Sequence, residues 1–416
     1  MTANAPSRSY WLQRWTALLL TGILAGLGGM LLALLLHEIQ HLVYGYSQKA
    51  LISPQSFLEG VTDASAHRRF LALLAAGLIA GCGWWLLARY GKKRVSISVA
   101  VNQPDKPMPG ITTLIHSLLQ IITVAMGSPL GREVAPRELG ALFAGGVARR
   151  LHLTTADIQL MIACGAGAGL AAVYNVPLAG AVFTLEVLLI SFSWEAAIAA
   201  LVTSALAAWV ATLGLGDEHQ YRYTTEMAAT SLVFWAALSG PLFGVAAFWF
   251  RRITQRARSK VRSNWQMPVF SLVAFAALGA LSMWFPQLPG NGKGPIQLTL
   301  AGDVTLNLAA AILCLKIFVI WAVLRGGAEG GLLTPGLAVG ALLGSLLFML
   351  LGRFFPGSDM ASFALTGAAG FLSASMQMPV TAIALMMEFT RMDHSFLVPL
   401  ILSAAGAYMT FRKLDG

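Results

Sequence analysis

Long stretches without charged side chains are the feature that most constrains how this chain can fold. A helix needs ~20 mostly apolar residues to cross about 30 Å of hydrocarbon, and the chain contains nine uncharged stretches of 19 residues or more. They are Trp15–Leu36, Phe70–Ala88, Ile111–Gly131, Ile158–Leu185, Ala196–Gly216, Ala228–Phe250, Asn264–Gly292, Gly330–Gly352 and Met360–Met387. Only 11% of the residues are charged, against about 25% in soluble domains. The sequence therefore predicts an all-α polytopic membrane protein.

Several of these stretches are longer than one span and contain internal glycine or proline. We interpret them as pairs of helices or as broken and tilted helices, which gives roughly fourteen helical pieces. Residues 1–416 are expected to form a single membrane domain, with no soluble domain at either end.

The net charge of +10 is interpreted as a signal of orientation rather than of nucleic-acid binding. The basic residues gather at the ends of the apolar stretches: Arg8, Arg14, Lys92, Lys93, Arg94, Arg251, Arg252, Arg256, Arg258, Lys260, Arg262, Arg412 and Lys413. Loops rich in Lys and Arg stay in the cytoplasm. Both termini are therefore predicted to be cytoplasmic.

A weak internal repeat lies beneath the hydropathy pattern. GAGAGLAAVYNVPLAGAVFTLEV (165–187) aligns without gaps on GAAGFLSASMQMPVTAIALMMEF (367–389). Each copy follows a glycine-led break, GREVAP (131–136) in the first half and GGLLTP (330–335) in the second. Inverted repeats with interrupted helices build transport sites near the membrane midplane. We predict two inverted repeats, approximately 15–216 and 228–411.

The physics of such a helix break points to an anion. The first turn of a helix has N–H groups without partners inside the helix, and the helix dipole places about half a positive charge there. Two broken helices aimed at one point favour a small anion without burying a full cation. A glutamate at the same helix start can occupy the anion position when ionised and leave it when protonated.

Five segments in order resemble the CLC family of chloride channels and chloride/proton antiporters. GRE at Gly131–Glu133 matches the family's GREGP motif, and GGLLTP is similar to its GxFxP motif. VYNVPLAGAVFTLEV, PGNG at Pro289–Gly292 and MPVTAIALMMEFT at Met378–Thr390 resemble further family segments. The resemblance implies an inverted-repeat CLC-like fold in a membrane, expected to be the inner membrane of a bacterium.

The resemblance also implies roles for individual residues. Glu133 would be the gating glutamate, and backbone amides would bind chloride or another small anion. The anion-binding and filter positions so implied are Gly131, Arg132, Val134, Gly330, Gly331, Leu332, Leu333 and Thr334. Family members are homodimers with a separate pore in each subunit, and the implied site requires no metal and no cofactor.

Three parts of the pore depart from the family pattern. Val134 and Ala135 replace the Gly and Pro of GREGP. The family's serine-bearing GSGIP stretch corresponds at best to VSISV, so Ser96 is a candidate anion ligand with Ser98 beside it. The family's pore tyrosine lies beyond the last match, and Tyr408 is not at its position.

Val187 stands where proton-coupled members have an inner glutamate, as it follows the family glutamate matched by Glu186. An apolar side chain cannot relay protons, so channel-like conduction is slightly preferred over proton-coupled exchange. Glu138, Glu186 or Glu329 could substitute as the acid. A fluoride exporter of the same family is a further alternative.

HEIQH at His37–His41 is a rival signal from another class, since HExxH on a helix is a zinc-protease motif. LDG at Leu414–Gly416 resembles the third-ligand motif of intramembrane zinc proteases. The predicted topology places the two motifs on opposite sides of the membrane, which disfavours an enzyme. Lys316 and Arg325, within or at the end of an apolar stretch, are expected to snorkel or to pair.

Overall fold

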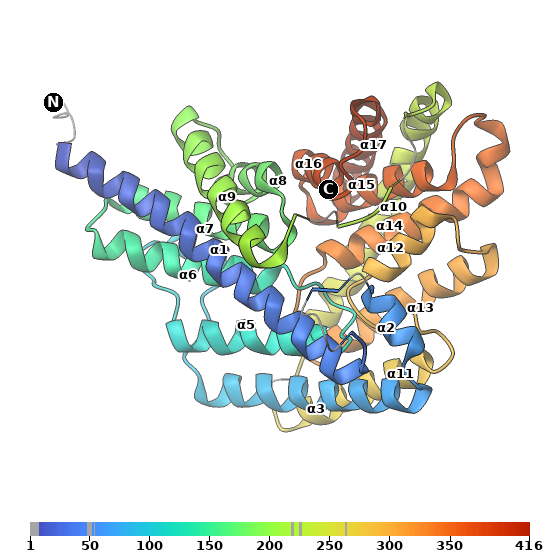
Figure 1. Cartoon of the computed structure of the whole chain (residues 1–416), viewed down its shortest axis with the longest axis horizontal. Coiled ribbons are helices and arrows are strands. Elements are labelled where there is room, and N and C mark those ends of the chain that lie inside the picture. The colour runs from blue at the N-terminus through green and yellow to red at the C-terminus, as the bar shows by residue number, and fades with distance from the viewer. Residues whose placement is uncertain (1–7, 48–51, 54, 218–219, 224–226, 263) are drawn as a thin grey trace. The chain divides into compact units, whose positions relative to one another are not determined.

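The computed structural model describes residues 8–47, 52–53, 55–217, 220–223, 227–262 and 264–416 (Figure 1). These residues form 17 α-helices: α1 (Arg8–Tyr44), α2 (Phe57–Asp63), α3 (Ala66–Tyr90), α4 (Ile97–Asn102), α5 (Gly110–Ala125), α6 (Val134–Arg150), α7 (Thr155–Tyr174), α8 (Pro177–Phe183), α9 (Trp194–Leu215), α10 (Thr230–Ser259), α11 (Gln266–Ser282), α12 (Lys293–Ala301), α13 (Leu306–Arg325), α14 (Leu333–Leu351), α15 (Met360–Met376), α16 (Pro379–Thr390) and α17 (Leu397–Asp415). A π-helix, η1 (Thr184–Leu189), follows α8, and two 3₁₀ turns occur at η2 (Gly352–Phe354) and η3 (His394–Phe396).

Eight helical segments of the described chain are long and apolar enough to cross a membrane. They contain α1, α3, α7, α9, α10, α13, α14 and α17. Shorter apolar helices such as α15 and α16 pair within one uncharged stretch, as expected. The all-α polytopic prediction is confirmed. The estimate of roughly fourteen pieces is too low, because short helices such as α2 and α4 lie outside the uncharged stretches.

The chain divides into two compact units. The first contains the described residues of Met1–Ala33, Lys92–Leu118 and Glu133–Glu218. The second contains those of Leu34–Gly91, Leu119–Arg132 and His219–Gly416. Within each unit, helices pack closely against one another.

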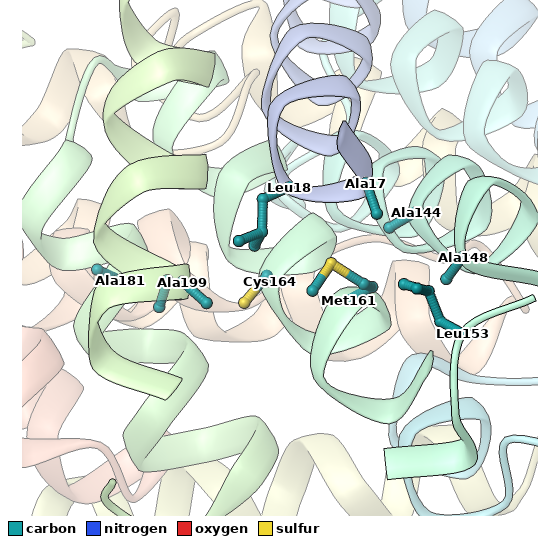
Figure 2. Packing of buried hydrophobic residues seen from close by; sticks show 10 residues of the cluster. Ala17, Leu18, Ala144, Ala148, Leu153, Met161, Cys164, Ala181 and Ala199 are labelled. Atoms are coloured by element: carbon teal, nitrogen blue, oxygen red, sulfur yellow. The ribbon is translucent and has the colours of Figure 1, made fainter. Parts of the chain in front are cut away.

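In the first unit α7 packs against both α6 and α9. Small side chains let these helices approach closely, and a Cβ added to Gly140 would lie 2.0 Å from the carbonyl oxygen of Gly165. Figure 2 shows the buried cluster between them, which also includes the start of α1. Its members are Ala17, Leu18, Ala144, Ala148, Leu153, Met161, Cys164, Ala181, Ala199 and Ala200.

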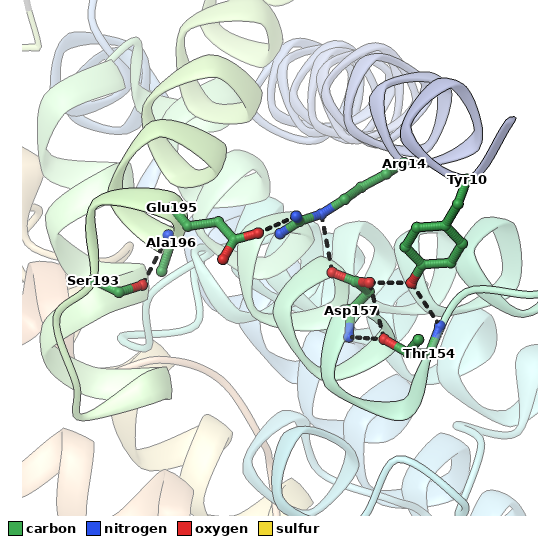
Figure 3. A network of polar contacts seen from close by, with 7 residues as sticks. All are labelled: Tyr10, Arg14, Thr154, Asp157, Ser193, Glu195 and Ala196. Carbon is green, nitrogen blue, oxygen red and sulfur yellow. Dashed lines mark hydrogen bonds and ion pairs between the residues drawn. The ribbon is translucent and has the colours of Figure 1, made fainter. Parts of the chain in front are cut away.

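A polar network ties three helices of this unit together (Figure 3). Arg14 of α1 forms ion pairs with Asp157 of α7, at 3.0 Å, and with Glu195 of α9. The hydroxyl of Tyr10 also donates to Asp157. Thr154 caps α7 by accepting the amide of Asp157. Arg14, interpreted from the sequence as an orientation signal, therefore also holds α1 to α7 and α9.

In the second unit α14 packs against α15, and α15 and α10 pack against α17. The contact between α14 and α15 again passes through two glycines. A Cβ added to Gly340 would lie 2.5 Å from the carbonyl oxygen of Gly367. Gly367 is the residue that the sequence repeat aligns with Gly165. The same close glycine contact thus occurs once in each unit.

The two aligned segments also share their turns. Asn175 ends α7 with φ 55° and Gln377 ends α15 with φ 56°, both in the left-handed region. Pro177 and Pro379 then occupy the first turn of α8 and α16, where the missing N–H of proline has no cost. The aligned sequences therefore fold into the same helix–turn–helix element.

Candidate functional site at two helix breaks

The first break precedes α6 and places Glu133 at its start. Glu133 is the N-cap residue with helical dihedral angles, φ −72° and ψ −20°, and its side chain makes no capping hydrogen bond. The residue is buried, with 1% of its surface exposed. The hydroxyl of Tyr174, at the end of α7, donates a hydrogen bond of 3.3 Å to Glu133 Oε2. The carboxylate is therefore held inside the first unit, away from bulk water.

The second break precedes α14. Leu332 is its N-cap residue, and Leu333 and Thr334 open the helix as buried residues. The first hydrogen bond of the helix runs from the amide of Gly336 to the carbonyl of Leu332, at 2.9 Å. In an α-helix the amides of the first turn receive no acceptor from the helix itself. The start of α14 thus has the donors and the dipole end that an anion needs.

Two hydrogen bonds join the breaks directly. Gly131 donates its amide to the carbonyl of Gly331 at 2.8 Å, and Gly331 donates to Gly131 at 2.9 Å. This pair is the one isolated β-bridge found in the described chain. Gly131 is the first residue of GREVAP, and Gly331 is the second residue of GGLLTP. One glycine of each predicted break therefore contacts a glycine of the other through backbone.

Arg258, near the end of α10, also contacts the second break. Its Nη2 donates a 2.8 Å hydrogen bond to the carbonyl oxygen of Gly330. The sequence reading of Arg258 as an orientation signal missed this contact. Nothing in the sequence links residue 258 to residue 330, because the bond depends on how α10 packs.

A basic pocket of about 230 Å³ opens beside this contact. Arg251 and Arg258 supply its positive charge, and Leu332 places the start of α14 in its wall. The complete lining is Phe250, Arg251, Thr254, Gln255, Arg258, Leu332, Ser375 and Met376. Cations beside the positive end of a helix repel it, so the arrangement favours an anion between them.

The loop before the first break is fixed by backbone hydrogen bonds to distant elements. Gly290, in the PGNG segment, donates to the carbonyl of Gly127 at 2.8 Å, and the hydroxyl of Tyr44 donates to that of Met126 at 2.9 Å. Lys316 is fully buried in α13 and donates to the carbonyls of Leu288, at 2.8 Å, and Gly290. Lys316 therefore pairs with backbone oxygens rather than snorkelling to water.

Ser96 lies at the N-cap of α4, where its hydroxyl accepts the amide of Val99 at 3.3 Å. The residue is exposed. A hydroxyl that accepts a capping bond keeps its own hydrogen, so it can still donate to another acceptor. Its assignment as an anion ligand stays a prediction.

The candidate proton-carrying acids have different surroundings. Glu138 is buried in α6, with its Oε2 3.5 Å from Nε2 of the buried His116. Glu186 and Val187 are partly exposed in the π-helix η1, a type of turn that occurs frequently at functional sites. Glu329 is partly exposed just before the second break. Of the three acids, Glu138 is thus the one buried beside a titratable partner.

HEIQH lies inside the last turns of α1. The rings of His37 and His41 are 6.4 Å apart, and the ring of His41 meets Tyr46 edge-on at 4.8 Å. Among the described residues, no group of three His, Cys, Asp or Glu side chains is placed to share a metal ion. The zinc-protease alternative gains no support from this packing.

These features define a class of protein: a polytopic helical membrane protein with two glycine-led helix breaks. Comparison with known proteins agrees with that class. The family model for voltage gated chloride channels matches residues 74–412. The chain belongs to this family, the CLC family of anion-transport proteins rather than of enzymes.

Individual relatives extend over most of the chain. The voltage-gated ClC-type chloride channel ClcB of Citrobacter koseri is 30% identical over 378 residues, which are 86% of this chain and 88% of that protein. ClcB of Salmonella typhimurium is 30% identical over 414 residues, 95% of each chain. The relatives are thus similar from end to end.

Solved structures share the fold at lower sequence identity. A slow cyanobacterial Cl⁻/H⁺ antiporter superimposes with a TM-score of 0.84 and 17% identity, covering 100% of this chain and 96% of that one. A CLC-type fluoride/proton antiporter gives 0.70 and 18%, covering 97% and 96%. The CLC-like fold predicted from the motifs is confirmed.

Proposed function

We propose that the protein carries chloride or a similar small anion across the membrane, through a pore in each subunit of a homodimer, with Glu133 as the gate. The observation that carries this proposal is the pair of hydrogen bonds between Gly131 and Gly331. Because glycine has no side chain, Gly131 and Gly331 can approach each other through backbone alone.

In the proposed mechanism the amides of Leu332, Leu333 and Thr334 at the start of α14 bind the central anion. Amides next to Arg132 and Val134 bind a second anion. When Glu133 is ionised, its carboxylate competes for this second position and the path is closed. Protonation or displacement of Glu133 admits the anion.

The basic pocket at Arg251 and Arg258 supports an approach route to the second break. Two guanidinium groups raise the local concentration of anions without burying them. Leu332 belongs both to the pocket wall and to the proposed anion-binding turn. Anions entering the pocket would therefore arrive beside the amides of α14.

Channel-like conduction is our preferred mode, because Val187 offers no acid where coupled members have one. Proton-coupled exchange is the second candidate, and the buried pair of His116 and Glu138 is the observation that favours it. The relatives named as chloride channels and the neighbours titled as proton antiporters correspond to these two modes. Selectivity for fluoride over chloride is a variant of either mode.

Membrane orientation follows from the basic residues. We propose an inner-membrane protein with cytoplasmic termini, which puts the end of α10 and its pocket on the cytoplasmic side. The approximate repeats 15–216 and 228–411 are part of the same proposal.

The test is anion efflux from chloride-loaded vesicles that contain the purified protein. Efflux is expected for the natural protein, and Glu133→Gln should raise it and remove its dependence on pH, because the amide cannot ionise. Glu59→Gln is the matched control, since it makes the same change from carboxylate to amide at an exposed residue of α2 that has no role in the proposed gate. The absence of efflux of chloride, nitrate and fluoride would contradict the proposal.

The same vesicles distinguish the two modes. A chloride gradient that drives protons uphill would establish exchange, and His116→Ala or Glu138→Gln should then uncouple protons from chloride. Efflux without proton movement would establish conduction.

A further inference from the structure

A second basic pocket, separate from the two helix breaks, lies between the ends of α10 and α13. Its volume is about 390 Å³, and its lining is Ile253, Arg256, Lys260, Trp321 and Arg325. Three of the five lining residues are cationic, and none of them is acidic. The transport proposal assigns no role to this pocket.

The helix ends account for only part of this charge. Arg256 and Arg325 lie in the last turns of α10 and α13, and Lys260 is the C-cap of α10. Each helix end carries about half a negative charge, so two ends offset about one of the three positive charges. A net charge of about +2 is left in the pocket, which suits a phosphate-bearing ligand.

Arg325 has one donor atom for which the described residues supply no acceptor. Its Nη1 atom is buried and makes no hydrogen bond to the described part of the chain. Its guanidinium carbon is 5.7 Å from the ring centre of Phe270, which Arg262 also approaches, at 5.3 Å. A buried guanidinium nitrogen without an acceptor is costly. Arg325 also lines the pocket, so a ligand phosphate there would lie beside its positive charge.

The apolar part of the pocket indicates a lipid rather than a soluble phosphate. Trp321 is 40% exposed and Ile253 is partly exposed, so an aromatic and an aliphatic side chain stand beside the cations. Trp concentrates at membrane–water interfaces, and basic pockets between helices on the cytoplasmic side bind acidic lipid headgroups. A free phosphate would gain nothing from these side chains.

We propose that this pocket binds the headgroup of an anionic phospholipid, with Arg256, Lys260 and Arg325 on the phosphate and Trp321 along the glycerol and upper acyl chain. The bound lipid would hold the ends of α10 and α13 together. α10 carries Arg258 to the carbonyl of Gly330, and α13 leads through Gly326 into the second break. Lipid binding itself does not depend on the anion-transport proposal.

The experiment is native mass spectrometry of the detergent-purified protein with equal amounts of phosphatidylglycerol and phosphatidylcholine. The natural protein is expected to retain phosphatidylglycerol preferentially. The triple variant Arg256→Gln, Lys260→Gln, Arg325→Gln should lower that preference on the order of a hundredfold, since each charge near an acidic lipid contributes about a factor of five. Arg325→Gln alone should lower it about fivefold.

A matched control removes three charges elsewhere: Arg252→Gln, Arg412→Gln and Lys413→Gln. It should keep the preference, because these residues lie outside the pocket. The charge-conserving pair Arg256→Lys and Arg325→Lys should also keep most of it, which guards against loss of binding through misfolding. Equal losses in the control and the triple variant would overturn the proposal. Release of the lipid by excess inorganic phosphate would also overturn it, by showing a site for soluble phosphate.

Discussion

The two helix breaks both begin with glycine but differ in their side chains. The first, GREVAP, carries Arg132 and Glu133 in the break itself, both buried. The second, GGLLTP, has no charged side chain, and its nearby cation, Arg258, comes from α10. A charge on a side chain can move, whereas backbone amides cannot. We therefore expect the first break to supply the movable part of the proposed site, which is the carboxylate of Glu133. We expect the second break to supply the fixed part, which is the backbone amides at the start of α14.

A single methyl group added at Gly330 should disrupt the second break. In Gly330→Ala the new Cβ would lie 2.7 Å from Cβ of Leu130 and close to the backbone of Gly131. Overpacking of this kind costs about 2 kcal/mol, and the strain falls on the joined breaks. We expect a lower unfolding temperature and a strong loss of anion efflux, measured by thermal melting and vesicle assays.

Gly336→Ala is the control for that substitution. It lies in the same helix, and its nearest neighbour would be Ser375 Oγ at 3.5 Å, an ordinary contact. Alanine favours helix by up to about 1 kcal/mol over glycine, so stability should be kept or raised and efflux unchanged. If both variants lost efflux equally, the fixed role of the second break would be wrong.

A smaller effect on efflux is expected when Arg258, the cation of α10 that contacts the second break, is replaced. Arg258→Gln loses the charged hydrogen bond to Gly330 and one charge of the basic pocket. Since Arg258 is exposed, we expect a loss of about 1 kcal/mol and about a fivefold lower efflux. Arg258→Lys should recover the pocket charge but not the fork geometry of the bond. Arg252→Gln, six residues earlier in α10, should leave efflux unchanged.

Two membrane-spanning helices, α13 and α17, were not predicted from the uncharged stretches. Nine uncharged stretches predicted most spans, but α13 and α17 lie outside them. In α13 the reason is Lys316, whose charge interrupts the pattern although its ammonium is satisfied by the carbonyls of Leu288 and Gly290. A buried cation with backbone partners has no signature in a single sequence.

The repeat, by contrast, was visible because its structure is local. Pro177 and Pro379 start helices, and Asn175 and Gln377 take left-handed conformations two residues before them. Such turns depend on neighbouring residues, so an alignment of short segments can predict them. The bond from Arg258 to Gly330 and that from Tyr174 to Glu133 join residues 72 and 41 positions apart, and only packing brings them together.

Tyr174 tests the movable part of the site, the carboxylate of Glu133. Its substitution is expected to have the smallest effect on anion efflux. Its 3.3 Å hydrogen bond to Glu133 is long, so its contribution is about 0.5–1 kcal/mol. Tyr174→Phe keeps the ring that fills this buried space and removes only the hydroxyl. If the hydroxyl holds the ionised carboxylate in the closed position, efflux at neutral pH should rise about two- to fivefold.

A double-mutant cycle decides whether the hydroxyl acts through the gate. With Glu133→Ala in the background, Tyr174→Phe should have no effect on efflux, because the acceptor is already gone. The rise caused by Tyr174→Phe should also disappear at low pH, where a protonated Glu133 has left the closed position. An equal rise in the alanine background would mean that Tyr174 affects the path independently of Glu133. The assignment of movable charge to the first break would then rest on Glu133 alone.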